Sequence, residues 1–140
     1  MTIAVIDGQG GRIGATLIEA LRKGGLGAPH RIIAVGANAL ATSAMLRAGA
    51  DQGATGENSV LVVSRMADVI AGPIGLLMAD AMLGEITEKM SVAIGRSDAL
   101  KVLLPVNQCR SIVAGTQTMT MRELIDSAAQ QIIQLSAARE

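Results

Sequence analysis

Hydrophobic residues along the chain alternate between short continuous runs and runs in which they recur every three or four positions. The continuous runs predict strands, and the spaced runs predict helices. We expect strands at residues 2–7, 31–36, 52–55, 68–72 and 101–106, with a weaker sixth strand at 111–114. Helices are expected at residues 12–23, 39–48, 57–66, 76–83, 87–96 and 120–137.

The order of these elements predicts the fold class. Short apolar strands separated by helices form parallel sheets whose two faces are covered by helices. We therefore expect an α/β fold, a Rossmann-like, doubly wound and mostly parallel sheet of five or six strands with helices on both faces. Because no linker or repeat interrupts the pattern, residues 1–140 are expected to form a single domain.

A glycine-rich segment follows the first predicted strand and opens the first predicted helix. The strand ends at Asp7, and the glycines are Gly8, Gly10, Gly11 and Gly14. A strand, a glycine turn and a helix in this order are typical of phosphate-binding sites, because the backbone can approach an anion and the helix N-terminus points at it. A purely structural turn is the alternative.

The glycine spacing and the second strand bear on the choice of cofactor. Gly8, Gly10 and Gly14 form G-x-G-x-x-x-G, with Ile13 in the position of the third glycine of the strict fingerprint. The end of the second strand, 34–38, has no carboxylate to hold the ribose of NAD, so NAD is disfavoured. NADP or another nucleotide stays open, with Arg12 as the nearest group for an additional phosphate.

Small and polar residues also gather where the other predicted strands end, and the carboxyl ends of parallel strands form the ligand-binding edge of such sheets. Thr55 could instead serve only as the N-cap of the following helix. The candidate ligand-binding residues are Gly8, Gln9, Gly10, Gly11, Arg12, Ile13, Gly14, Asn38, Thr55, Glu57, Asn58, Gly72, Pro73 and Asn107.

Composition and charge exclude several classes of function. Lys and Arg together number 12, Asp and Glu also number 12, and Phe, Tyr and Trp are absent. The chain therefore lacks the basic excess and the aromatic rings that nucleic-acid binding uses. Its longest apolar stretch, 69–79, is shorter than the roughly 20 residues that span a bilayer. No secretory signal, zinc spacing or disulfide pair is evident, since Cys109 is the single cysteine, so we expect a cytoplasmic protein without a metal site.

The mean hydropathy of +0.44 is high for a chain with 17% charged residues. It indicates more apolar surface than one small core hides, so we expect a homo-oligomer. The predicted helix at 76–83 or the C-terminal one at 120–137 is the expected contact.

Several runs together resemble the bacterial domain-of-unknown-function family 3842: Ile6–Gly14, Ala37–Met45, Gly49–Asn58, Gly72–Gly75, Met82–Thr87 and Leu103–Cys109. The resemblance spans nearly the whole chain. It implies a short cytoplasmic bacterial protein that is Rossmann-like at its N-terminus. It implies no activity and no catalytic residues.

Two functions are compatible with these observations. The first is binding of a nucleotide or small phosphorylated ligand at the glycine-rich turn and the strand ends, with or without a reaction. The second is a non-enzymatic sensor or assembly subunit whose glycine turn is structural. The catalytic residues are unknown. Cys109 is a nucleophile, a soft metal ligand, a redox-sensitive thiol or a small buried filler. Glu85 is a general base, an exposed turn residue or an N-terminal carboxylate for the next helix.

Overall fold

The structure is a computed structural model that describes residues 1–106 and 110–139. Its strands are β1 (Thr2–Asp7), β2 (Arg31–Gly36), β3 (Gln52–Thr55), β4 (Val69–Pro73) and β5 (Leu100–Leu104). Its helices are α1 (Arg12–Lys23), α2 (Ala39–Arg47), α3 (Glu57–Met66), the short 3-10 helix η1 (Ile74–Leu77), α4 (Glu88–Arg96) and α5 (Met121–Ala137). The α/β fold class is confirmed.

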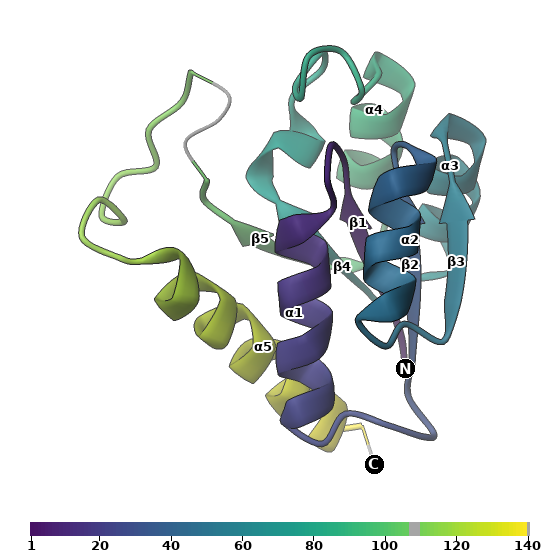
Figure 1. Cartoon of the computed structure of the whole chain (residues 1–140), viewed down its shortest axis with the longest axis vertical. Coiled ribbons are helices and arrows are strands. Elements are labelled where there is room, and N and C mark those ends of the chain that lie inside the picture. Colours follow the sequence, from purple (N-terminus) through teal and green to yellow (C-terminus); the bar gives the residue numbers. More distant parts are fainter. Residues whose placement is uncertain (107–109, 140) are drawn as a thin grey trace.

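The strands form one parallel sheet in the order β3-β2-β1-β4-β5 (Figure 1). Residues that alternate along each strand pack into two separate cores. Ile3 and Val5 belong to the core beneath α1, α2 and α5, while Ala4 and Ile6 belong to the core beneath α3 and α4. The sheet is therefore the middle layer of three, and the connections are doubly wound as expected.

Local signals explain where α2 and α5 begin. Asn38 is the N-cap of α2, and its side chain accepts a hydrogen bond from the Ala41 N–H at 2.9 Å. At α5, Thr120 accepts from the Glu123 N–H at 3.2 Å, and the Glu123 carboxylate accepts from the Thr120 N–H at 2.8 Å. This reciprocal pair is a capping box, which satisfies two backbone donors that would otherwise lack partners.

The predicted sixth strand at 111–114 is wrong. Within the described residues, 110–119 contain turns and irregular backbone, and β5 is the last strand. Ile112 lies in this segment with 80% of its surface exposed, so the apolar run does not pack against the sheet edge. A four-residue apolar run was too short a signal to predict pairing.

The predicted helix at 76–83 is also wrong. Only η1 forms there, and turns follow it as far as residue 86. Asp80, Met82 and Leu83 adopt positive φ angles of 66°, 57° and 56°, which a right-handed helix excludes. The fully buried Leu76 and Ile86 hold both ends of the segment against the α3–α4 side of the sheet. This packing overrides the helical propensity of the residues between them.

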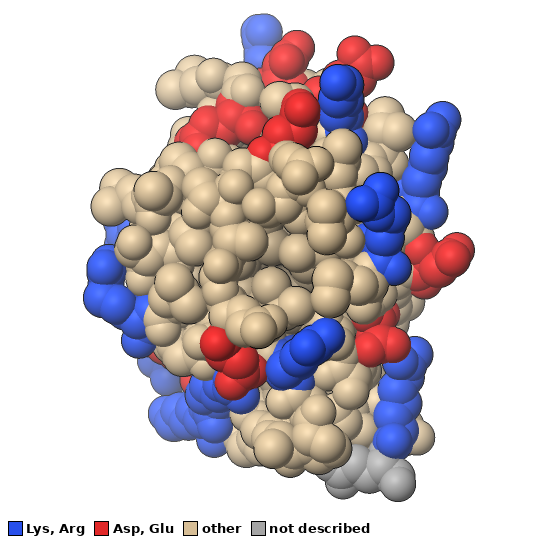
Figure 2. Space-filling model, turned by 90° about the vertical axis from the view of Figure 1, so that its right-hand side faces the viewer, with Lys and Arg blue, Asp and Glu red and all other residues tan. Residues whose placement is uncertain are grey.

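No helix in the described part of the chain is long and apolar enough to cross a membrane. The side of the molecule that bears β3 has a broad central area without charged side chains (Figure 2). Both helices that contact β3 carry exposed apolar side chains: Leu40 and Leu46 on α2, and Val62 and Met66 on α3.

Candidate functional site

The glycine-rich segment forms the turn between β1 and α1, at the carboxyl edge of the sheet. The strand order reverses between β1 and β4, and doubly wound sheets bind ligands at such a switch point. Gly11 ends the turn with φ 69°, and its N–H donates to the Gly8 carbonyl at 2.9 Å. A Cβ at position 11 would lie 2.7 Å from Cα of Ala41, so this position requires glycine.

Gly14 brings α1 close to β1. A Cβ at this position would lie 3.1 Å from Cβ of Asp7 and would also collide with Met45. In the dinucleotide fingerprint, the third glycine has this role of close helix–strand packing. Gly14 therefore permits the same close packing of helix on strand as the third glycine of the fingerprint, although it lies one residue later than in the strict spacing.

Asp7 organises the turn from beneath. It is 4% exposed, and its Oδ1 and Oδ2 accept hydrogen bonds from the N–H groups of Gly8 and Gly14, both at 2.8 Å. Burial raises the pKa of Asp7 above its ordinary value of 3.8, and the nearby Glu85 carboxylate raises it further. The backbone N–H groups of Gly14, Gly8 and Ile13 lower this pKa and partly offset the effect. One carboxylate thus ties the start of the turn to the first turn of α1.

Glu85 holds the turn from outside. Its Oε1 accepts from the Gln9 N–H at 2.9 Å, and its Oε2 accepts from Nδ2 of Asn38 at 2.6 Å. The Asn38 amide also donates to the Gln9 carbonyl at 2.9 Å. Glu85 is half-buried, so the alternative that it is an exposed turn residue is wrong. It links the connection between β4 and α4 to the glycine turn and to the end of β2.

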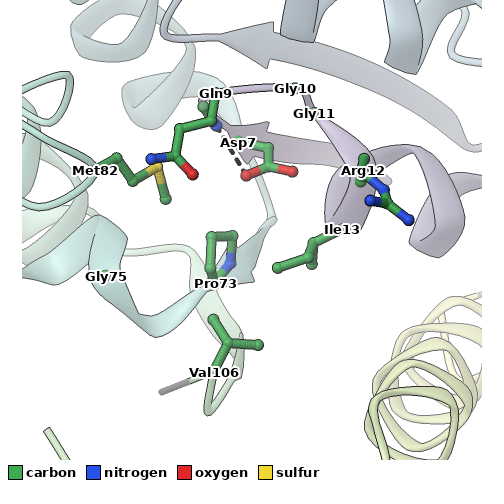
Figure 3. Close-up of a pocket in the computed structure, with 11 residues that line it drawn as sticks. Asp7, Gln9, Gly10, Gly11, Arg12, Ile13, Pro73, Gly75, Met82 and Val106 are labelled. Atoms are coloured by element: carbon green, nitrogen blue, oxygen red, sulfur yellow. Dashed lines mark hydrogen bonds between the residues drawn. The ribbon is translucent and has the colours of Figure 1, made fainter. Parts of the chain in front are cut away.

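A pocket of roughly 540 Å³, including the space at its open mouth, lies beside this turn (Figure 3). In Figure 3, Met82 and Arg12 lie at opposite ends of the pocket, and Pro73 and Val106 lie below the turn. The residues that line the pocket are Asp7, Gly8, Gln9, Gly10, Gly11, Arg12, Ile13, Pro73, Gly75, Met82 and Val106.

Two backbone donors in the pocket wall make no hydrogen bond within residues 1–106 and 110–139. Among the described residues, the N–H groups of Gly10 and Arg12 have no hydrogen-bond partner. Both lie at the N-terminus of α1, a helix of 12 residues, where the helix dipole favours an anion. The exposed Arg12 side chain adds a positive charge at the same end.

The structure gathers about half of the candidate ligand-binding residues around this pocket. Gly14, Gly72 and Asn38 lie next to it without lining it: Gly14 and Gly72 are buried, and Asn38 contacts Glu85. Asn107 lies outside the described residues. The residues that line the pocket as expected are Gly8, Gln9, Gly10, Gly11, Arg12, Ile13 and Pro73.

Thr55, Glu57 and Asn58 lie elsewhere, at the junction of β3 and α3, and do not line the pocket. Thr55 is not the N-cap of α3, because Gly56 holds that position with φ 96°. The Thr55 hydroxyl instead shares a hydrogen bond of 2.7 Å with the Thr42 hydroxyl. β3 is an edge strand two positions from β1, so its end is too far along the sheet to join the pocket.

Sequence reasoning missed four lining residues. Asp7 was visible as the polar residue that ends the first strand, but a buried carboxylate beneath the turn has no distinct sequence signal. Gly75, Met82 and Val106 come from connections whose path depends on tertiary packing. Met82 was missed because residues 76–83 were predicted to form a helix, and that helix gave no reason to place Met82 against the glycine turn.

The sequence matches the family described as a domain of unknown function, DUF3842, over residues 2–137. The chain belongs to this family. The expected resemblance is therefore confirmed over nearly the whole length. A comparison of this DUF3842 protein with curated proteins found no match.

Among solved structures, the DUF3842 chain is similar to the crystal structure of a dodecameric FMN-dependent UbiX-like decarboxylase from Escherichia coli O157:H7. The two sequences are 12% identical, and the match covers 98% of this chain and 94% of the other, with a TM-score of 0.47. A likeness at this level carries no argument about ligand or assembly.

Proposed function

We propose that this DUF3842 protein binds a nucleotide or another small phosphorylated ligand in the pocket beside the glycine turn. The observation that supports the proposal is that the N–H groups of Gly10 and Arg12, at the N-terminus of α1, have no hydrogen-bond partner in the described part of the chain. Backbone donors at a helix N-terminus, with an arginine beside them, suit a phosphate group.

The local charges are compatible with an anion. The carboxylates of Asp7 and Glu85 are close to the turn, and each accepts hydrogen bonds through both of its oxygens. These bonds partly compensate the negative charges. A phosphate group would therefore contact Gly10 and Arg12, away from the N–H groups that Asp7 and Glu85 already occupy.

A thermal-shift screen with nucleotides and phosphorylated metabolites, followed by calorimetry, tests the proposal. Arg12→Ala should weaken a phosphorylated ligand by about 1.5–3 kcal/mol, the range for a hydrogen bond to a charged group. Arg65→Ala is the matched control, because Arg65 is an exposed arginine in the last turn of α3 and does not line the pocket. Equal affinities for the two variants would contradict the assigned role of Arg12.

The second candidate is a non-enzymatic sensor or assembly subunit with a structural glycine turn. The observation that favours it is that the N–H groups of Gly8, Gln9 and Gly14 already bind the protein's own carboxylates. Such a turn is stable without a ligand. A screen in which no phosphorylated compound raises the melting temperature would favour this candidate.

We also propose a homo-oligomer in which a second copy covers the side that bears β3. This edge strand, Gln52-Gly53-Ala54-Thr55, contains no charged residue and no proline, the features that usually protect an edge from pairing. The charge-free area in Figure 2 extends over the same side. This surface replaces 76–83 as the proposed contact, since that segment is not a helix.

A further inference from the structure

The connection between β4 and α4 crosses over the end of β1. It leaves the sheet at Pro73, on the β4 side, and it returns to the sheet region at Ile86, which is fully buried. Between these points, Met82 and Glu85 lie against the glycine turn. A Cβ at Gly8 would be 2.6 Å from the Met82 sulfur, which shows how closely the connection packs on the backbone there.

Glu85 fixes this crossing to the β2 side of the turn. Its carboxylate bridges the Gln9 N–H at 2.9 Å and the Asn38 amide at 2.6 Å. Asn38 is itself held, because its Oδ1 accepts from the Ala41 N–H and its Nδ2 also donates to the Gln9 carbonyl, both at 2.9 Å. The bridge therefore ends on a rigid group at the end of β2.

This crossing divides the ligand-binding edge of the sheet. In Rossmann folds, a dinucleotide extends across the switch point, and its adenosine ribose meets the end of the second strand. The corresponding place here is Asn38, which Glu85 contacts. The pocket lies on the other side: its lining comes from the glycine turn and from residues at or beyond the ends of β4 and β5, and none comes from β2 or β3.

We propose that Glu85 excludes dinucleotides from the glycine turn and confines the ligand to a mononucleotide or smaller phosphorylated compound on the β4 side. The inference rests on the proposed function, since it specifies the class of ligand for the same pocket. Glu85 acts in two ways. It occupies the Gln9 N–H that a second phosphate would need, and its charge repels an anion brought to that place.

Glu85 lies near the end of β2, so the opposite hypothesis is that it binds the ribose of a dinucleotide. In Rossmann folds a carboxylate at the end of the second strand has that role. Both of its oxygens already bind protein donors, and neither Glu85 nor Asn38 lines the pocket. The two ideas predict opposite effects of removing the side chain.

The experiment measures binding of phosphate, AMP and FMN and of the dinucleotides NAD, NADP and FAD by calorimetry. The proteins are the wild type, Glu85→Ala, the milder Glu85→Gln and the control Glu88→Ala. Glu88 is an exposed acid in the first turn of α4, three positions along the chain. Melting curves establish that each variant is folded. We expect the wild type and the control to bind a compact ligand and no dinucleotide. Glu85→Ala should keep the compact ligand and gain at least tenfold in dinucleotide affinity.

The possible results separate this inference from the proposed function. Dinucleotide binding by the wild type as tight as that of a mononucleotide would overturn the inference and leave the proposed function standing. So would a folded Glu85→Ala variant that binds the compact ligand but gains no dinucleotide. Loss of dinucleotide binding on removal of Glu85 would show that Glu85 holds the ribose. If no compound binds to any variant, the proposed function fails and the inference fails with it.

Discussion

Substituting Gly10 by alanine should separate ligand binding from folding. Gly10 lines the pocket, and a Cβ built there would meet only Cγ of Arg12 at 3.8 Å, an ordinary contact. Its φ angle lies outside the left-handed region, so alanine can adopt the same backbone. A compatible Gly→Ala change stabilises a protein by about 0.4–1 kcal/mol, mainly by restricting the unfolded chain. The melting temperature should therefore stay equal or rise slightly.

The effect on binding should have the opposite sign. If a phosphate oxygen accepts from the Gly10 N–H, the additional methyl group lies next to that bond and pushes the oxygen away. Losing a hydrogen bond to a charged group costs about 1.5–3 kcal/mol. The affinity should then fall about 10- to 150-fold. Calorimetry with the ligand found in the screen measures this value directly.

Two other glycines provide the controls. At Gly27, which is remote from the pocket, a Cβ meets nothing within 4 Å and φ is ordinary, so Gly27→Ala should change neither binding nor folding greatly. At Gly11, the left-handed backbone and the contact with Ala41 together should destabilise the alanine variant by about 2–5 kcal/mol. The reasoning is refuted if Gly10→Ala binds the ligand as well as Gly27→Ala does, or if it unfolds as Gly11→Ala should.

Three further predictions concern stability and assembly. Because burial raises the pKa of Asp7, the folded protein binds this proton more tightly than the unfolded chain, so the contribution of Asp7 to stability decreases as pH rises through its folded-state pKa. Melting curves of Asp7→Asn between about pH 3 and pH 7 should lack that slope, and an unchanged slope would contradict the assignment. The pKa of Asp68 is lowered, chiefly because its carboxylate accepts a hydrogen bond from the Thr2 N–H at 2.7 Å. The stabilising contribution of Asp68 is therefore present at neutral pH and is lost as pH falls through its folded-state pKa. Asp68→Ala should lower the melting temperature at neutral pH more than in acid. Light scattering should give an oligomer for the wild type and a smaller species for Leu46→Asp with Met66→Asp, whereas a monomeric wild type at micromolar concentration would exclude the proposed contact.

The elements that the sequence predicted well are those whose local and tertiary signals agree. The continuous apolar runs Ile3–Ile6, Ile32–Val35 and Val69–Ala71 are buried in β1, β2 and β4, as is typical of central parallel strands. Asparagine is a favoured N-cap residue, and Asn38 caps α2. The edge strand β3 carried a weaker signal because it is partly exposed, and it was still placed at Gln52–Thr55.

The elements that were mispredicted depend on distant parts of the chain. Residues 76–83 are mostly good helix formers, and the sequence alone favours a helix. In the structure, the Asp80 N–H donates to the Ile86 carbonyl at 2.7 Å, and this bond closes a turn that burial of Ile86 holds in place. The candidate site likewise contains one part that the sequence predicted and one part that it did not. The glycine turn is local and was predicted, whereas the link from Glu85 to Asn38 joins residues 47 positions apart.

The backbone around Glu85 supports the view that its contacts hold a strained segment in place. Met82 and Leu83 have consecutive left-handed φ angles of 57° and 56°, and neither is glycine. Such a conformation costs roughly 1–2 kcal/mol per residue, and it persists only where the surroundings determine it. Leu83 is 99% exposed and contributes no burial in return. The compensation must come from the neighbours: the burial of Ile86, the packing of Met82 on Gly8, and the two hydrogen bonds of Glu85. Removing the Glu85 side chain would therefore take away contacts that offset this cost. Relaxation of the segment away from the glycine turn would then add to the gain in dinucleotide binding that follows from losing the Glu85 charge and its bond to the Gln9 N–H.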